Sequence, residues 1–304
     1  SVKSRGLGDV YKRQLYLITV IFLLSSCQTL SSIQETLGFV EEDPNAPVKL
    51  DENYESFLDI SWQKKIEKPL LDLSFFGENI ESNIFFDINA GTIYNLNEKQ
   101  LELIDADTGQ LSEVFELETD RIISGVSVGY NSFFYVDADG IVYAHDANSG
   151  DLKWKKELED VVLSKILITS TQAFLQTSSD VLYGMDLQTG ETKWQKQAQA
   201  PLLSIRGTAS PIIYEGLIFT SFSNGRLAAV RAVDGIQLWE KPISRLKGST
   251  ELEKLMDGDS NAITINEEVF VANYNGSLTR FNIRSGDKVF SVDHSTSKPI
   301  LFNK

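Results

Sequence analysis

The chain has 304 residues, and its 28 basic and 43 acidic side chains give a formal net charge of −15 at pH 7. An acidic surface repels phosphates, so the composition argues against a nucleic-acid partner. The single cysteine, Cys27, excludes an intrachain disulfide, and two histidines far apart in sequence, His145 and His294, offer little material for a metal site or a histidine base.

The first residues do not look like part of a folded domain. The stretch SRGLGDVYKRQ, Ser4 to Gln14, resembles a translated sequencing adapter along its whole length, so we expect residues 1–14 to be foreign to the protein. The ten residues from Leu15 to Leu24 are too few to span a bilayer, which takes roughly 20 residues, and they suit the apolar core of a secretory signal. Residues 15–26 are therefore predicted to be a truncated signal peptide.

The apolar run leads into the tetrapeptide LSSC, which ends at Cys27 and resembles the bacterial lipobox. This resemblance implies cleavage before Cys27 and acylation of its thiol and new amino terminus, because one acyl chain alone anchors only marginally. Gln28, where Asp would retain a lipoprotein in the inner membrane, implies the outer membrane. The alternative is an ordinary buried cysteine. Residues 27–55 are polar and acidic, and we expect a lipid anchor and flexible tether there.

A repeat organises the rest of the chain. Glycine recurs at intervals of 41, 40, 45 and 51 residues, and an aromatic side chain follows each copy on a predicted last strand. Ten residues before three of these glycines lie Asp-Gly or Asn-Gly pairs, which predict two-residue hairpin turns because both residues tolerate positive φ. The repeat glycines are Gly109, Gly150, Gly190, Gly235 and Gly286; the aromatics are Phe115 (beside Val114), Trp154, Trp194, Trp239 and Phe290; the pairs are Asp139-Gly140, Asn224-Gly225 and Asn275-Gly276.

Alternating apolar and polar residues around these turns predict a four-stranded antiparallel unit, and repeats of this length predict an all-β chain with the fold of a β-propeller. The D-x-x-T/S-G-x-x-x-W pattern resembles the quinoprotein-type (PQQ-like) blade. Five copies are visible, and Trp62 is predicted to play the aromatic's part on the last strand of a further blade. We expect residues 56–304 to form an incomplete propeller.

Other motifs favour structural roles. The sequence DADG at residues 137–140 is half of a calcium loop but is better explained as a hairpin turn, and His145 is expected at a packing or rim position. The signature residues Asp105, Asp146 and Asp186 are expected to accept backbone hydrogen bonds in the turn that follows. No nucleophile–base pair, phosphate loop or metal cluster stands out, so no catalytic residue, metal or cofactor is predicted.

Two connections between units depart from the repeat. One is PLLSIRGTASP, residues 201–211, and the other is SRLKGSTELEKLMDGDSNA, residues 244–262. Both join the last strand of one unit to the first of the next, so propeller geometry places them side by side on one face. An apolar loop with an arginine beside an acidic loop is a plausible protein-binding surface. The alternative is two decorated loops in which Arg206 pairs internally with Asp257 or Asp259.

The loop sequences LSIRG and GSTELEKLMDGD resemble those of the BamB family, lipoproteins of the outer-membrane β-barrel assembly (BAM) machinery. The resemblance implies an eight-bladed propeller, of which about five blades are present here, held at the inner leaflet of the outer membrane through Cys27. It also implies loops that bind the POTRA domains of BamA, with unfolded outer-membrane proteins as further partners. The implied contact residues are Leu203, Ile205, Arg206, Asp257 and Asp259.

The resemblance has departures: Ile205 stands where leucine is usual, the first unit has no tryptophan, and Arg231 and Asn282 replace the signature aspartate. It implies a scaffold that assists folding and insertion of outer-membrane proteins, and not an enzyme. Two alternatives stay open. One is a PQQ-dependent dehydrogenase, although many of those carry a vicinal cysteine pair and a calcium site. The other is a lipid-anchored scaffold of a different envelope complex.

Overall fold

The computed structural model describes residues 60–64, 86–97, 99–198, 209–244, 260–273 and 276–293. All of them lie in one compact unit, residues 57–304. Every regular element within them is a β-strand, and the strands form five antiparallel four-stranded sheets. Within the same residues there is no helix with the length and apolar character needed to cross a bilayer.

The five sheets take up the strands four at a time in chain order. The first contains β1 (Phe86–Asn89), β2 (Thr92–Asn97), β3 (Gln100–Asp105) and β4 (Leu111–Glu116). The second contains β5 (Ser127–Gly129), β6 (Ser132–Val136), β7 (Ile141–Asp146) and β8 (Leu152–Glu157). The third contains β9 (Leu167–Ile168), β10 (Gln172–Gln176), β11 (Val181–Asp186) and β12 (Thr192–Gln197). The fourth contains β13 (Ile212–Tyr214), β14 (Leu217–Phe222), β15 (Arg226–Arg231) and β16 (Gln237–Pro242). The fifth contains β17 (Ile263–Ile265), β18 (Glu268–Val271), β19 (Ser277–Asn282) and β20 (Lys288–Asp293).

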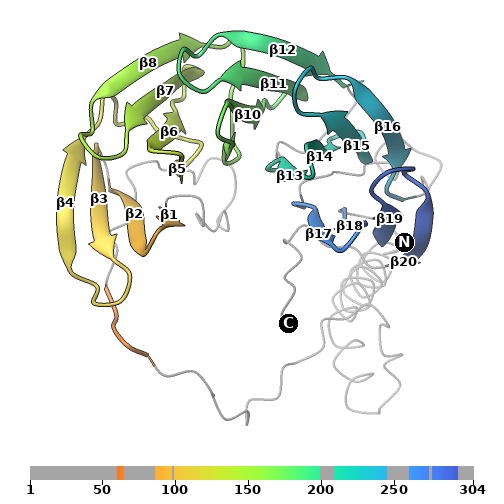
Figure 1. Cartoon of the computed structure of the whole chain (residues 1–304), viewed down its shortest axis with the longest axis horizontal. Coiled ribbons are helices and arrows are strands. Elements are labelled where there is room, and N and C mark those ends of the chain that lie inside the picture. Colours follow the sequence, from red (N-terminus) through yellow and green to blue (C-terminus); the bar gives the residue numbers. More distant parts are fainter. Residues whose placement is uncertain are drawn as a thin grey trace, which may run out of the picture. The chain divides into compact units, whose positions relative to one another are not determined.

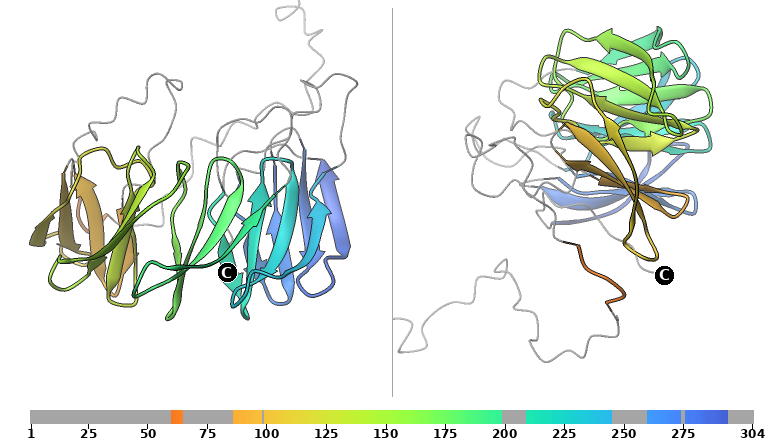
Figure 2. Two further views of the ribbon diagram at one scale, coloured as in Figure 1. Left: turned by 90° about the horizontal axis from the view of Figure 1, so that it is seen from above. Right: turned by 90° about the vertical axis from the view of Figure 1, so that its left-hand side faces the viewer.

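Each sheet is a meander in which neighbours in sequence are neighbours in space. The sheets follow one another in chain order, with the first strand of each on the inner side and the fourth on the outer side (Figure 1). Their strands run between two opposite faces (Figure 2). This is the arrangement of propeller blades, and the predicted all-β fold is confirmed; we call the sheets blades 1 to 5.

Apolar side chains fill the spaces between successive blades. Phe133 of β6 packs with Leu101 of blade 1, whereas the next residue, Phe134, packs with Leu175 of blade 3. Consecutive residues point to opposite faces of a strand, and both faces of β6 are buried, which explains the apolar run from Phe133 to Val136. Each such side chain contributes about 1.5–3 kcal/mol through removal from water.

Tryptophans on the outer strands join blades 2, 3 and 4 to the blade that follows. Trp154 of β8 lies against Gly190 of blade 3, where φ is +73° and a Cβ atom would stand 2.6 Å from the indole ring. Its indole Nε1–H also donates to the carbonyl oxygen of Leu187 at 3.0 Å. The predicted packing against the next blade is confirmed for the repeat tryptophans, whereas Phe290, on the last described strand, contacts Phe270 of its own blade. The same pair of contacts recurs for Trp62 with Gly109 and Ala106, Trp194 with Gly235 and Ala232, and Trp239 with Gly286 and Ile283.

Blade 1 makes this junction differently. Phe115, and not its neighbour Val114, lies against Gly150, where a Cβ atom would stand 2.6 Å from the phenyl ring. The ring has no N–H group, so this junction has the apolar contact without the hydrogen bond. In the register of β3 with β4, Glu113 occupies the position of the tryptophans, and Phe115 reaches the glycine from two residues farther along.

The predicted two-residue turns at the Asp-Gly and Asn-Gly pairs are wrong. Four residues separate β6 from β7, and of the pair Asp139-Gly140 only Gly140 has a positive φ, +80°. Its N–H donates to the carbonyl oxygen of Asp137 at 3.1 Å, which gives a longer turn closed by one left-handed glycine. Gly225 behaves alike at +70°, while Gly276 has no positive φ and Asn275 is outside the described residues.

True two-residue turns join the first and second strands of the blades instead. Tyr130 and Asn131, with φ of +50° and +59°, stand between the paired residues Gly129 and Ser132. Both central residues are left-handed, as a type I′ turn requires, although neither is glycine. The residue types at Tyr130 and Asn131 therefore did not predict this turn, which is set by the pairing of β5 with β6.

Candidate functional site

The six predicted site residues all lie outside the described residues. They fall in three stretches of the chain, of which two join neighbouring blades. Of the loops predicted at residues 201–211 and 244–262, the central parts lie outside the described residues; we call the undescribed residues 199–208 the first connection and 245–259 the second connection. Cys27 precedes the propeller; Leu203, Ile205 and Arg206 belong to the first connection; and Asp257 and Asp259 belong to the second.

The described residues show where each connection leaves and re-enters the propeller. Both leave the outermost strand of one blade, β12 or β16, and enter the innermost strand of the next, β13 or β17. In an antiparallel meander this places all four ends on the face that also carries the β10–β11 and β14–β15 hairpins. We call it the connection face.

The points at which the chain re-enters the propeller after the two connections are in direct contact. The backbone N–H of Ser210 donates to Oδ1 of Asn261 at 2.7 Å. Ser210 is the second residue after the first connection, and Asn261 is the second after the second connection. Ala209 and Ser260, which precede them, are buried. The chain therefore enters blades 4 and 5 at two adjoining, fixed points.

Ala198, the last residue before the first connection, is bonded to Asp180, whose carboxylate is buried. The N–H of Ala198 donates to the backbone carbonyl of Asp180 at 3.1 Å. The Asp180 side chain, 2% exposed, accepts the N–H of Ser223 at 3.1 Å and Nε2 of Gln176 at 3.1 Å. Burial raises the pKa of Asp180, although these hydrogen bonds oppose the rise. Asp180 thus links blade 3 to blade 4 beneath this end of the connection.

The second connection follows Ser244, which is buried. Its Oγ donates to Oδ1 of Asn273 at 2.6 Å and accepts the N–H of Ser277 at 2.7 Å. Both partners belong to blade 5, whereas Ser244 ends blade 4. Hydrogen bonds between blades therefore hold the start of the second connection and the points where both connections re-enter the propeller, whereas the start of the first is held by a bond within blade 3.

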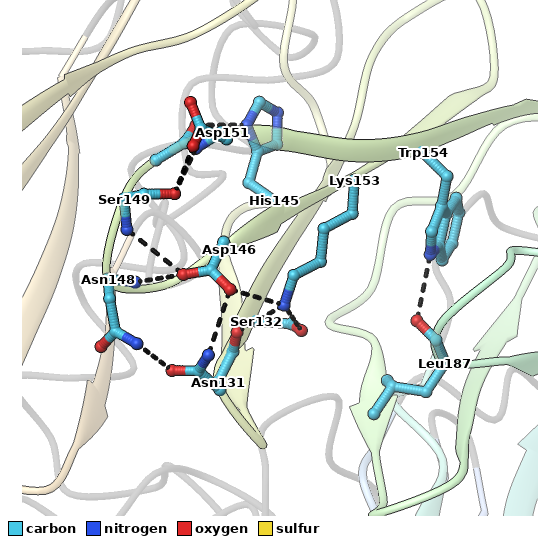
Figure 3. Close-up of polar contacts among 11 residues, drawn as sticks. Asn131, Ser132, His145, Asp146, Asn148, Ser149, Asp151, Lys153, Trp154 and Leu187 are labelled. Carbon is cyan, nitrogen blue, oxygen red and sulfur yellow. Dashed lines mark hydrogen bonds and ion pairs between the residues drawn. The ribbon is translucent and has the colours of Figure 1, made fainter.

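The signature aspartates shape turns on the opposite face, as predicted. Asp146 Oδ1 accepts the N–H groups of Asn148 at 2.9 Å and Ser149 at 3.2 Å, and Oδ2 pairs with Lys153 at 3.0 Å (Figure 3). These bonds hold the pKa of Asp146 below its usual value. In blade 3, the hydrogen bond from Lys193 and those from the backbone lower the pKa of Asp186 to about 2.

The two blades that lack the aspartate reach the same turn with other side chains. Asn282 Oδ1 accepts the N–H groups of Arg284 at 3.0 Å and Ser285 at 3.1 Å. Arg231 pairs instead with Asp234, whose Oδ1 accepts the N–H of Ile236 at 3.2 Å. The departures from the signature therefore preserve the turn.

His145 packs inside the protein and not at its rim. It is 1% exposed, and its ring stacks on Phe133 with a centroid distance of 4.8 Å. Nδ1 lies 2.9 Å from the carbonyl oxygen of Gly150, so it carries the proton and donates (Figure 3). Nε2, 3.1 Å from the Tyr135 hydroxyl, then accepts. Burial lowers the pKa of His145, and its two nitrogens are occupied by structural bonds.

The DADG stretch forms a hairpin turn and not half of a calcium loop, as predicted, although the turn is longer than the predicted two-residue type. Asp137 Oδ1 accepts the N–H groups of Asp139 at 3.0 Å and Ile141 at 2.9 Å, and Oδ2 accepts the hydroxyl of Tyr143 at 3.1 Å. Its oxygens are thus committed to the turn. Across the described parts of the chain, His, Cys, Asp and Glu side chains nowhere gather in threes in a way that could hold a metal ion.

Ser210 and Asn261 lie inside the two loops singled out from the sequence, residues 201–211 and 244–262, but they were not identified as site residues. Each lies 25 residues before the repeat glycine of its own blade, Gly235 or Gly286. Their equal distance from the repeat glycine could have placed them at equivalent positions of neighbouring blades. It could not have shown that they bond, because small polar residues are common where a strand begins.

Comparison with known proteins gives a consistent assignment. The family model described as outer membrane protein assembly factor BamB matches residues 97–302. The protein of that name from Escherichia coli K12 is 37% identical over 172 residues, which are 57% of this chain and 44% of that protein. The chain spans about half the length of the curated relatives it matches.

Solved structures show the same fold. The crystal structure of BamB from Moraxella catarrhalis matches with a TM-score of 0.65 at 23% identity, over 72% of this chain and 67% of that one. A europium-containing methanol dehydrogenase matches with a TM-score of 0.54 at 13% identity, over 69% of this chain and 50% of that one. The fold is therefore common to an assembly factor and an enzyme. Function must be argued from the functional residues and not from the fold.

Proposed function

The chain belongs to the family of the outer membrane protein assembly factor BamB, and we propose on this basis that it is a scaffold of the BAM complex that assists the folding and insertion of outer-membrane proteins. The observation that carries the proposal is the match of the family model over most of the propeller. The contact between the entry points of the two connections, Ser210 and Asn261, supports a paired binding site.

In the proposed site, the two connections bind the periplasmic POTRA domains of BamA. Leu203 and Ile205 would supply apolar contact, and Arg206 a charge-assisted hydrogen bond, the combination that anchors protein interfaces. Asp257 and Asp259 would bond to the partner or hold Arg206 in place. Unfolded outer-membrane proteins are proposed as further partners.

The proposed location is the inner leaflet of the outer membrane. Acylation of Cys27 would hold the protein there, with residues 27–55 as the tether between the lipid and the propeller. A scaffold of this kind needs no catalytic group. The carboxylates that stand out in the described blades, Asp137, Asp146 and Asp180, are all engaged in turns or blade junctions.

The second candidate function is a PQQ-dependent dehydrogenase, which the structural likeness to methanol dehydrogenase favours at the level of the fold. The curated relatives are named as assembly factors, which supports the scaffold instead. Reconstitution with the quinone and calcium, followed by dye reduction with alcohol substrates, distinguishes the two. Turnover above that of a heat-denatured control would establish the enzyme.

Co-purification tests the proposed partner. Tagged chain is isolated from outer-membrane extracts, and BamA is quantified for the wild type, Leu203→Asp and Arg206→Ala. Matched controls are Val233→Asp, which places a charge on an exposed valine of blade 4, and Arg284→Ala, on the face opposite the connections. We expect BamA to be lost from the first two variants and kept by the controls; equal recovery from all of them would contradict the site.

A further inference from the structure

We propose that Asn261 is a positioning residue of the partner-binding site: its side chain fixes the spacing between the points at which the chain enters blades 4 and 5 after the two connections. The inference rests on the proposed function, since it concerns how that site is held together. Asn261 lies in the second predicted loop, residues 244–262, but is not among the implied contact residues, and it would be needed for binding without touching the partner.

A series of hydrogen bonds, here called the relay, joins the entrances of successive blades. The N–H of Lys165 in blade 3 donates to Oγ of Ser210 in blade 4 at 3.2 Å. The N–H of Ser210 in turn donates to Oδ1 of Asn261 in blade 5 at 2.7 Å. All three residues lie 25 positions before the repeat glycine of their blade. A backbone donor of one blade thus binds a side-chain acceptor at the same position in the next.

The residue type at this position decides whether the relay continues. Lysine has donors and no acceptor, so Lys165 cannot receive the corresponding bond from blade 2. There the bond runs in the opposite direction, from the N–H of Ile166 to Oγ of Ser127 at 2.9 Å. The Lys165 amino group reaches past blade 2 to blade 1, 2.7 Å from the carbonyl oxygen of Phe86 and 3.2 Å from Asp87 Oδ1.

Asp87 of blade 1 also bonds to blade 2, because its Oδ2 accepts the N–H of Val128 at 2.8 Å. The relay therefore joins all five described blades around their inner strands. One bond of the relay lies next to both connections. It joins Ser210, the second residue after the first connection, to Asn261, the second residue after the second connection.

The outer part of the same junction has an independent attachment. Trp239 of blade 4 lies against Gly286 of blade 5, and its Nε1–H donates to the carbonyl oxygen of Ile283 at 2.9 Å. Loss of the Asn261 side chain would leave this contact in place. The expected effect is a change in spacing at the inner edge, where the connections enter, with the blades still packed.

Two variants that differ by one oxygen atom test the role. Asn261→Ala removes the acceptor, whereas Asn261→Ser keeps a hydroxyl of the kind that accepts a backbone N–H at Ser210. Binding of the chain to purified POTRA domains of BamA is measured by calorimetry. We expect the dissociation constant to rise about fivefold for Asn261→Ala, the value of one hydrogen bond, and to return close to wild type for Asn261→Ser.

Ser127→Ala is the matched control, since it removes the equivalent link between blades 2 and 3, away from both connections. A merely structural role predicts that both alanine variants lower the melting temperature and neither alters binding; that result would overturn the proposal. Should Asn261→Ala not fold, the pair Asn261→Val and Asn261→Thr repeats the comparison with a larger side chain.

Arg206→Ala separates this inference from the function on which it rests. If Arg206→Ala leaves binding unchanged, the proposed site itself is wrong. If Arg206→Ala weakens binding and Asn261→Ala behaves like Ser127→Ala, the site stands and the positioning role is refuted. Weakened binding in both Arg206→Ala and Asn261→Ala, with Ser127→Ala unaffected, supports both.

Discussion

Trp194 of blade 3 lies directly against Gly235 of blade 4, where a Cβ atom would stand 2.6 Å from the indole ring. The glycine is required twice, once by its φ of +72° and once by the absence of space for a side chain. The recurring glycine and aromatic of the repeat are therefore two halves of one contact between successive blades.

Gly235→Ala and Gly216→Ala separate these two requirements. Gly216, in the same blade, has a similar φ of +77°, but a Cβ atom there would meet no other atom within 4 Å. We expect Gly216→Ala to lower the free energy of unfolding by about 1–2 kcal/mol through backbone strain alone. Gly235→Ala should cost about 3 kcal/mol or more, because overpacking adds to the strain. Equal losses in urea unfolding would refute the packing role.

Trp194→Phe tests the hydrogen-bonded half of the junction. The phenyl ring keeps contact with Gly235 but cannot donate to the carbonyl oxygen of Ala232, 2.9 Å from the indole nitrogen. The unpaired carbonyl should lower the free energy of unfolding by about 1–3 kcal/mol. The measurement is thermal or urea unfolding, and a stability within error of the wild type would show that water replaces the indole.

His145 should make the protein less stable at mildly acidic pH. Burial lowers its folded-state pKa, so the unfolded chain binds more protons as the pH falls below the ordinary value of 6.5. Its contribution to stability is complete above about pH 6.5 and is lost as the pH falls towards the folded pKa. His145→Met, which places the residue of the equivalent position Met185, should reduce the dependence of unfolding free energy on pH between about 7.5 and 5.5. An unchanged slope would contradict a neutral buried imidazole.

Asp180 should act with the opposite sign. Burial raises its folded-state pKa, so its contribution is largest below the ordinary value of 3.8 and is lost as the pH rises through the folded pKa. Asp180→Asn keeps an oxygen for Ser223, and asparagine tolerates the φ of +61° at this position. The stability of the variant relative to the wild type should increase from about pH 4 to pH 6 in urea titrations. A constant difference would show that the carboxylate is not penalised by burial.

The repeat could be read from the sequence because glycine with positive φ and a large aromatic are both rare and specific. The period located Gly190, Trp154 and even Trp62, far from the other copies. The turns were harder: Asp139-Gly140 has the composition of a two-residue turn, but the four residues between the strands decide its type.

The site could be predicted only in part. The lengthened interval before Gly286 pointed to the second connection, and the blade order pointed to its neighbour. The bond between Ser210 and Asn261 could not be predicted, because it joins residues 51 positions apart and depends on how two blades are packed. The role of a side-chain acceptor at a strand entrance can be recognised only when the position of the backbone N–H that binds it is known.

Photocrosslinking at single positions tests the central claim most directly, namely that the connection face binds the POTRA domains of BamA. A benzophenone amino acid is placed at position 206 in the first connection, or at position 284, where the Arg284–Glu215 pair marks the opposite face. After irradiation with BamA, we expect a crosslink from position 206 and none from position 284. A crosslink from position 284 without one from position 206 would contradict the claim.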